Sequence, residues 1–134
     1  LAKAAGARRC VPLRVSGPFH TPFMKSAGDA LAVRFKTTPF HPMRIPVCFN
    51  CLGREIHEDE RIPDLLERQV QSPVHMEATL CRLAELGVDT WVEIGPGKTL
   101  SGFVKKTLKG AHPVSLETRE DIARFIALQK ENRL

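Results

Sequence analysis

Apolar residues along the chain follow two alternating spacings, one helical and one of period two, which predicts alternating helices and strands. The helical spacing predicts helices at 1–6, 24–35, 59–70, 73–86, 98–109 and around 122–126. The period of two predicts strands at 10–15, 45–49, 90–94 and 113–116. Strands and helices in this order favour an α/β layer fold with a mainly parallel sheet.

The predicted sheet is too small to be complete by itself. Parallel sheets are covered on both faces, so three or four strands would leave apolar surface open unless further chain joined them. The sequence also begins at Leu1, without an initiator methionine and within an expected helix. We therefore expect the 134 residues to be part of a longer protein.

Composition and charge narrow the class of protein. With 43% hydrophobic and 26% charged residues, the chain can bury a core. No segment predicts a membrane span or a secretory signal, so we expect a cytoplasmic protein that does not engage a membrane. A net charge of +5 with only 6% aromatic residues disfavours nucleic-acid binding and favours an acidic substrate or an acidic protein partner.

The four cysteines do not predict a metal site. Cys48 and Cys51 have the CxxC spacing, and His57 could be a third ligand, but no fourth ligand lies nearby in the sequence. A structural zinc site needs four ligands. We therefore expect no metal, and interpret the cysteines as small apolar residues.

One histidine stands out as a candidate general base. His20 lies in the segment 16–22, which contains two prolines and a glycine and follows a predicted strand. Such loops at strand ends commonly carry functional side chains, and histidine titrates in the physiological range. The alternative is a histidine that only ties the loop together through hydrogen bonds. No serine lies in a GxSxG motif, so the chain offers a base without a nucleophile.

Two further features have competing interpretations. The glycine-rich turn at 95–98 precedes a predicted helix and could bind phosphate, but Pro96 removes a backbone donor, which favours a simple tight turn. Gln69 lies on the apolar stripe of the helix predicted at 59–70. It must therefore find a hydrogen-bond partner or lie at the edge of the stripe.

Four blocks of sequence together resemble a known family. They are LRVSGPFHTPFM at 13–24, IPV with Asn50 at 45–50, RQV and SPV at 68–74, and EIGPGKTL at 93–100. In this order and at this spacing they are similar to the C-terminal part of the malonyl-CoA:acyl-carrier-protein transacylases. The resemblance implies an α/β-hydrolase-like large subdomain at 16–134, preceded at 1–15 by the last helix and strand of a ferredoxin-like small subdomain.

The resemblance also implies roles for individual residues. His20 matches the catalytic base, and Gln69 matches the residue whose main-chain carbonyl orients that base. Phe19 and Asn50 match positions at the substrate, and the bulky Phe19 is typical of family members that accept malonyl units. His75 and Met76 depart from the family, which often has Gln or Arg followed by Trp there.

The implied reaction is transfer of a malonyl group from coenzyme A to the phosphopantetheine thiol of acyl carrier protein, in fatty acid biosynthesis. No cofactor is implied, because malonyl-CoA is a substrate and the carrier protein brings the phosphopantetheine. The family's nucleophilic serine, its carboxylate-binding arginine and its oxyanion-hole glutamine lie upstream and are absent here. We therefore expect the chain alone to be inactive without its N-terminal part. A non-catalytic carrier-binding fragment and an acyl hydrolase of the same fold stay open as alternatives.

Overall fold

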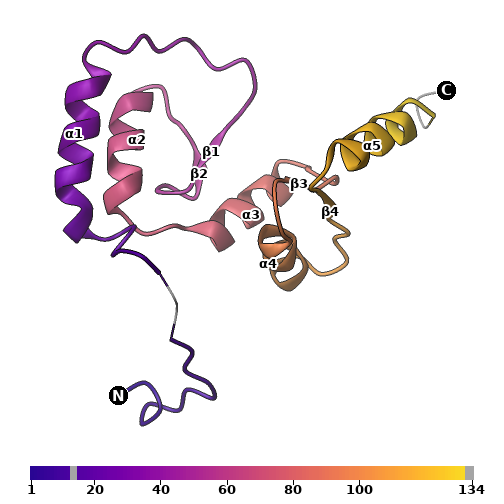
Figure 1. Ribbon diagram of the computed structural model, residues 1–134, viewed down its shortest axis with the longest axis horizontal. Helices are drawn as coiled ribbons and strands as arrows, with labels where there is room; N and C mark the ends of the chain where they lie inside the picture. The colour runs from indigo at the N-terminus through magenta and orange to yellow at the C-terminus, as the bar shows by residue number, and fades with distance from the viewer. Residues whose placement is uncertain (13–14, 132–134) are drawn as a thin grey trace.

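The computed structural model describes residues 1–12 and 15–131, which form a mixed α/β structure (Figure 1). Its helices are η1 (Pro22–Met24, a 3-10 turn), α1 (Lys25–Phe35), α2 (Ile62–Gln71), α3 (Met76–Glu85), α4 (Thr99–Thr107) and α5 (Arg119–Glu131). Its strands are β1 (Cys48–Phe49), β2 (Arg54–Glu55), β3 (Val92–Ile94) and β4 (Val114–Leu116). The predicted α/β class is confirmed, whereas the division at residue 15 stays a prediction.

The strands form two separate two-stranded sheets in the described residues. β1 and β2 pair antiparallel as a short hairpin, and β3 pairs parallel with β4. The expected mainly parallel sheet is therefore present only as β3 and β4. The strand predicted at 45–49 is shorter than expected, because Pro46 lacks the N–H that a ladder needs.

Two small hydrophobic clusters hold the chain together. The first lies between the hairpin and α2, with Phe49, Cys51 and Leu65 buried at its centre. The second lies where α3 and α4 meet β3, around Leu80, Trp91 and Val104. Helices α1 and α2 lie side by side, whereas α5 and the N-terminal segment extend away from the rest (Figure 1).

The structure differs from the prediction in two elements near the N-terminus and in the start of one helix. Residues 1–7 form only hydrogen-bonded turns, because so short a segment has no packing partner to stabilise a helix. Residues 10–12 and 15 form no strand, and 13–14 lie outside the described residues. The helix predicted from Pro73 begins at Met76 instead. Ser72 is extended, as residues before proline prefer, so α2 ends there and 73–75 form a link.

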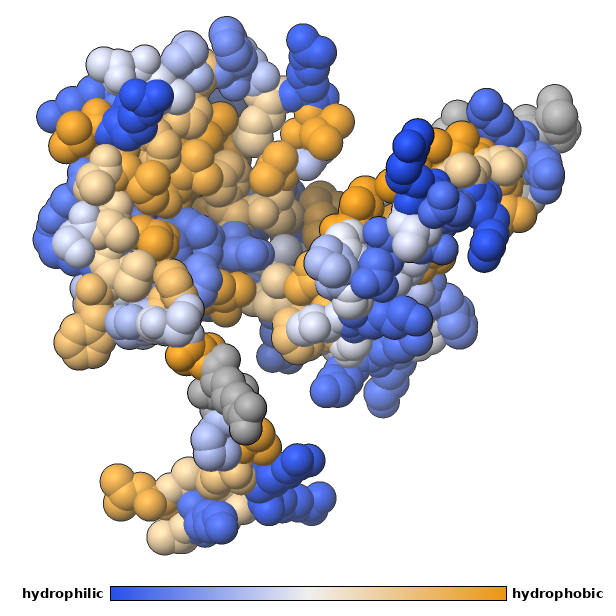
Figure 2. Space-filling model, viewed as in Figure 1, coloured by the Kyte–Doolittle hydropathy of each residue, from blue (hydrophilic) through white to orange (hydrophobic). Residues whose placement is uncertain are grey.

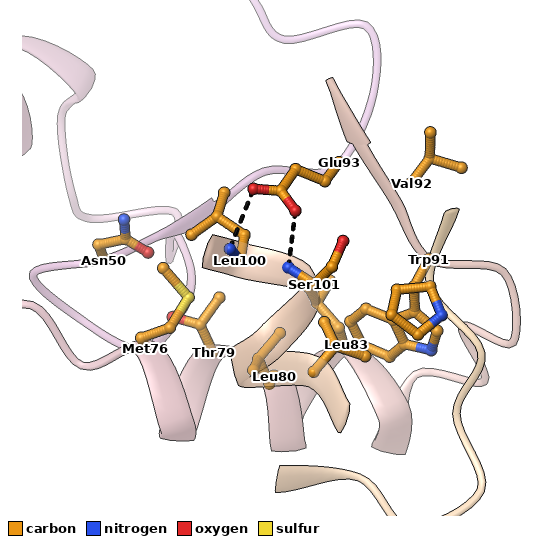
Figure 3. Close-up of a pocket in the computed structure, with 12 residues that line it drawn as sticks. Asn50, Met76, Thr79, Leu80, Leu83, Trp91, Val92, Glu93, Leu100 and Ser101 are labelled. Carbon is orange, nitrogen blue, oxygen red and sulfur yellow. Dashed lines mark hydrogen bonds between the residues drawn. The ribbon is translucent and has the colours of Figure 1, made fainter. Parts of the chain in front are cut away.

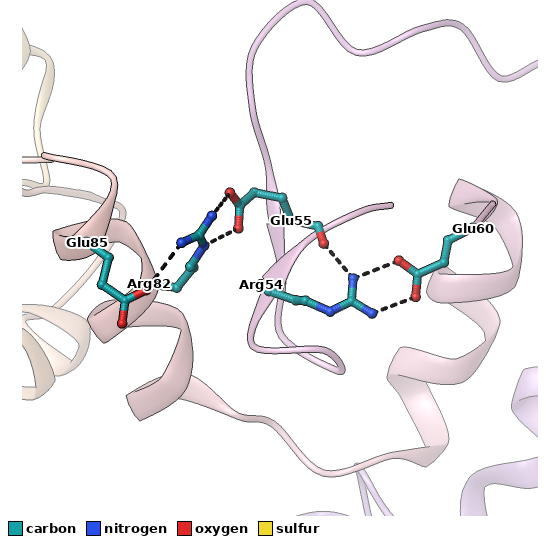
Figure 4. Close-up of polar contacts among 5 residues, drawn as sticks. All are labelled: Arg54, Glu55, Glu60, Arg82 and Glu85. Atoms are coloured by element: carbon teal, nitrogen blue, oxygen red, sulfur yellow. Dashed lines mark hydrogen bonds and ion pairs between the residues drawn. The ribbon is translucent and has the colours of Figure 1, made fainter. Parts of the chain in front are cut away.

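Ion pairs attach the hairpin to the helices on both of its sides (Figure 4). Arg54 pairs with Glu60, just before α2, at 2.8 Å. Glu55 pairs with Arg82 on α3, whose Nε and Nη2 donate to the two carboxylate oxygens at 2.8 and 3.0 Å. These paired contacts fix the hairpin, and therefore the corner between its strands, against α2 and α3.

None of the described helices combines the length and apolar character that crossing a bilayer requires.

Candidate active site

His20 is anchored by both its backbone and its ring to the end of α2. Its N–H donates to the carbonyl oxygen of Val70 at 3.1 Å, and its Nδ1 lies 2.9 Å from the carbonyl oxygen of Gln69. The backbone of His20 is in the left-handed region, with φ +61°. That conformation brings the N–H and the ring to two successive carbonyls of one helix turn.

The helix end explains why these carbonyls are available. The last four carbonyls of an α-helix have no partner within the helix, and α2 ends at Gln71. His20 supplies partners for two of them. A carbonyl only accepts hydrogen bonds, so Nδ1 must carry the proton, and in the neutral ring Nε2 then holds the free lone pair. The side chain is exposed, which leaves Nε2 open to a reacting group.

The loop around His20 is held by local contacts. The Thr21 hydroxyl donates to the carbonyl oxygen of Pro18 at 2.7 Å, and η1 begins directly afterwards at Pro22. Phe19 is 53% exposed, and its ring lies 3.4 Å from where a Cβ on Gly17 would be. Phe19 therefore lies over the loop beside His20, where its ring can contact a bound molecule.

The side chain of Gln69 has a partner of its own. Its Oε1 accepts the backbone N–H of Cys51 at 2.8 Å. This contact satisfies the polar group that the sequence places on an apolar stripe. Gln69 therefore contacts the His20 loop through its main chain and the corner after β1 through its side chain.

Asn50 lies at that corner, at the edge of a pocket of about 220 Å³ between α3, α4 and β3 (Figure 3). Its carbonyl oxygen accepts the N–H of His75 at 2.8 Å, just before α3. Met76, Thr79 and Leu80 from α3 line the same pocket. The structure thus connects Asn50 to Gln69 through the adjoining residue Cys51, while the His75 side chain is exposed.

The glycine-rich turn at 95–98 does not offer an open anion site. The carboxylate of Glu93 accepts the N–H groups of Leu100 at 3.0 Å and Ser101 at 2.8 Å, at the start of α4 (Figure 3). Hydrogen bonds from Ser101 and from the Leu100 N–H hold the pKa of the Glu93 carboxyl below its usual value. A protein carboxylate therefore occupies the place that a phosphate would take at this helix end.

The CxxC cysteines are packed within the protein. Cys51 is buried in the first hydrophobic cluster, and burial raises the pKa of the Cys48 and Cys51 thiols. Raised thiol pKa values disfavour the reactive thiolate. Within residues 1–12 and 15–131, no group of three or more His, Cys, Asp or Glu side chains is placed to hold a metal ion.

Helices flanking a parallel strand pair, together with a loop histidine held by a helix carbonyl, define an α/β protein with a candidate general base. No family model matches the chain. It is 38% identical over 131 residues to the malonyl CoA-acyl carrier protein transacylase of Bacillus subtilis (strain 168), over 98% of this chain and 41% of that protein.

Solved structures give the same result. The malonyl CoA-acyl carrier protein transacylase of Clostridium perfringens superposes with a TM-score of 0.88 at 33% identity, over 98% of this chain and 42% of that one. A type II polyketide acyl-carrier protein in complex with its malonyl-transacylase matches with a TM-score of 0.81 at 36% identity, over 90% of this chain and 40% of that one. The predicted resemblance to malonyl-CoA:acyl-carrier-protein transacylases is confirmed, and the chain spans about two fifths of their length.

Proposed function

We propose that this chain supplies the general base of a malonyl-CoA:acyl-carrier-protein transacylase. The observation that carries the proposal is the 2.9 Å contact between Nδ1 of His20 and the carbonyl oxygen of Gln69, which leaves Nε2 exposed as the proton acceptor. The carbonyl takes the orienting role that an aspartate has in a Ser-His-Asp triad. The nucleophilic serine comes from the upstream part of the longer protein.

In the first half-reaction, His20 Nε2 takes the proton of the serine hydroxyl as its oxygen attacks the malonyl thioester carbon. The carbon–sulfur bond breaks, and His20 returns the proton to the departing coenzyme A thiolate. In the second half-reaction, His20 takes the proton of the phosphopantetheine thiol, whose sulfur attacks the malonyl-serine ester. The serine leaves with that proton, which restores the starting state.

The substrate and partner follow from the same comparison. The relatives are named for malonyl-CoA and acyl carrier protein, and we extend both to this chain in fatty acid biosynthesis. The net charge of +5 suits the phosphates of coenzyme A and an acidic carrier protein. Phe19 beside the base favours malonyl over α-methylated units, a preference of about 1–3 kcal/mol for one methyl group.

The test uses a chimera in which this chain replaces the matching part of the Bacillus subtilis transacylase. We expect the chimera to transfer malonyl groups to holo acyl carrier protein, and His20→Ala to lower kcat by about 10²- to 10⁴-fold. His41→Ala removes another exposed loop histidine and is the matched control. Radiolabelled malonyl-CoA measures both transfer and release of malonate.

Other outcomes favour the other functions. Undiminished transfer by His20→Ala would contradict the base assignment. Binding of the carrier protein without transfer would indicate a non-catalytic docking protein. Release of malonate to water in place of transfer would indicate a hydrolase.

A further inference from the structure

We propose that the side chain of Gln69 is a positioning residue that holds Asn50 at the substrate, an inference that rests on the function proposed above. The main-chain carbonyl of the same residue orients His20. One helix residue therefore sets the position of the base with its backbone and the position of a substrate contact with its amide.

The geometry of α2 makes this double contact possible. In an α-helix the carbonyl points toward the C-terminal end, whereas the side chain leans back toward the N-terminal end. The Gln69 carbonyl accordingly reaches His20 beyond the end of α2, at 2.9 Å. Its Oε1 reaches the Cys51 N–H, one residue beyond Asn50, at 2.8 Å.

The corner that carries Asn50 is attached to both neighbouring helices. The Cys51 thiol donates to the Leu65 carbonyl oxygen of α2 at 3.6 Å, alongside the contact with Gln69. On the other side, the Asn50 carbonyl oxygen accepts the His75 N–H before α3. The Gln69 amide and the Cys51 thiol therefore both attach this corner to α2, and the bond to the Gln69 amide, at 2.8 Å, is the shorter of the two.

Loss of that amide has a local consequence. Cys51 is only 1% exposed, so water cannot readily replace the Oε1 acceptor of its N–H. A buried donor without a partner is unfavourable, and the corner must shift to find one. Asn50 moves with the corner, whereas the main-chain carbonyl of Gln69, and with it the anchor of His20, stays in place.

Three substitutions in the chimera separate these effects. Gln69→Met removes the acceptor oxygen while keeping a long, helix-favouring side chain. Gln69→Glu keeps an oxygen in the same place and should restore the contact. Gln71→Met is the matched control. It removes an amide from the same helix turn, but the Gln71 side chain lies against Gly28 of α1 and not against the corner.

We expect Gln69→Met to raise KM for malonyl-CoA about tenfold, the loss of one hydrogen bond, with kcat kept within about threefold. Asn50→Ala should raise KM similarly, and the double variant should be no worse than either single variant. Hydrogen exchange of the peptide around Cys51 should accelerate in Gln69→Met. Gln69→Glu and Gln71→Met should leave KM and that exchange close to wild type.

Each contrary result has one meaning. Unchanged KM in Gln69→Met, or additive effects of Gln69→Met and Asn50→Ala, would overturn the positioning role. A fall in kcat alone would show that Gln69 acts through His20, which also overturns it. A folded wild-type chimera that transfers no malonyl would overturn the proposed function itself, while exchange at Cys51 would still report whether the amide holds the corner.

Discussion

His20 illustrates how a single residue combines strain with two anchoring bonds. Its φ of +61° places a residue with a Cβ in the left-handed region, which disfavours the fold by about 1–2 kcal/mol. The hydrogen bonds to the Gln69 and Val70 carbonyls offset that cost, because these carbonyls have no partner within α2. The strain therefore persists at the residue that the proposed chemistry needs.

Gly53 is the residue where the backbone and the packing both exclude a side chain. Its φ is +72°, and a Cβ there would lie 2.8 Å from the Cβ of Ala78 on α3. We expect Gly53→Ala to destabilise the protein by about 2 kcal/mol or more, from left-handed strain together with overpacking. Urea unfolding followed by circular dichroism measures the change, and a loss under about 0.5 kcal/mol would contradict it.

Gly28 is the matched control for that substitution. It is also buried, but it lies within α1 at an ordinary helical φ, and its closest neighbour is the end of the flexible Gln71 side chain. A helical Gly→Ala change favours folding by about 1 kcal/mol where the new methyl group fits. We expect Gly28→Ala to be neutral or slightly stabilising once the Gln71 amide has moved aside.

At the scale of elements, charge pairs orient the β1–β2 hairpin. Arg54 of β2 extends to Glu60 just before α2, whereas Glu55 of β2 accepts the guanidinium of Arg82 on α3 (Figure 4). The Arg54 guanidinium, aided by the His57 N–H, lowers the pKa of Glu60 to about 2. The Arg82 guanidinium likewise lowers the pKa of Glu55.

This pairing predicts how stability depends on acid. The unfolded Glu60 carboxyl titrates near 4.5 and the folded one near 2, so between these values the unfolded chain binds more protons. The stabilisation is complete above about pH 4.5 and is lost as the pH falls toward 2. Glu60→Gln should therefore be less stable than wild type at neutral pH, and the two should converge as the pH falls.

Urea unfolding at several pH values tests this prediction. Glu58→Gln, which changes an exposed carboxylate two residues away, is the control and should follow the wild-type curve. A difference between Glu60→Gln and wild type that stays constant down to pH 2 would show that the ion pair does not account for it.

Local hydrophobic periodicity predicted α1 and α2, whereas the short strand β2 depends on pairing with another segment of the chain. The apolar stripes at 24–35 and 59–70 correspond to α1 and α2, because helical periodicity is a property of the segment itself. β2 was missed, because two residues show no period and its pairing with β1 is set by the turn between them.

The same distinction applies to the candidate site. The resemblance indicated that the Gln69 carbonyl meets His20, and the structure has this contact. The bond from the Cys51 N–H to the Gln69 side chain joins residues 18 apart in the sequence, and no spacing rule encodes it. The requirement that a polar group on an apolar stripe be satisfied was the only available signal.

At the scale of the whole molecule, the exposed surface is too large for a compact monomer. A 14.9 kDa chain of compact shape exposes about 7,000 Å². This chain exposes 10984 Å², about 4,000 Å² more than that scaling gives. Large apolar side chains contribute, including Ile94 at 75% and Phe23 at 84% exposure, and Figure 2 shows apolar patches on the body and along α5.

The exposed apolar surface predicts that the chain needs further protein to cover it, such as the upstream part that its transacylase relatives have, in order to fold stably. Two small clusters bury few apolar side chains, whereas β3 leaves Val92 and Ile94 exposed on a parallel strand of a kind that is normally covered on both faces. We expect the 134-residue chain alone to unfold at low temperature, with a broad transition and no malonyl transfer.

In the chimera with the Bacillus subtilis upstream part, the same segment should unfold cooperatively at a higher temperature. The reason is that covering β3 and the exposed apolar side chains adds buried apolar area. Calorimetry of the two proteins measures the difference, and hydrogen exchange of β3 should slow in the chimera. Replacing the exposed Ile94 with threonine should lower the melting temperature of the chimera more than that of the chain alone. Equal melting temperatures and equal exchange of β3 in both proteins would show that this surface faces solvent in the chimera as well.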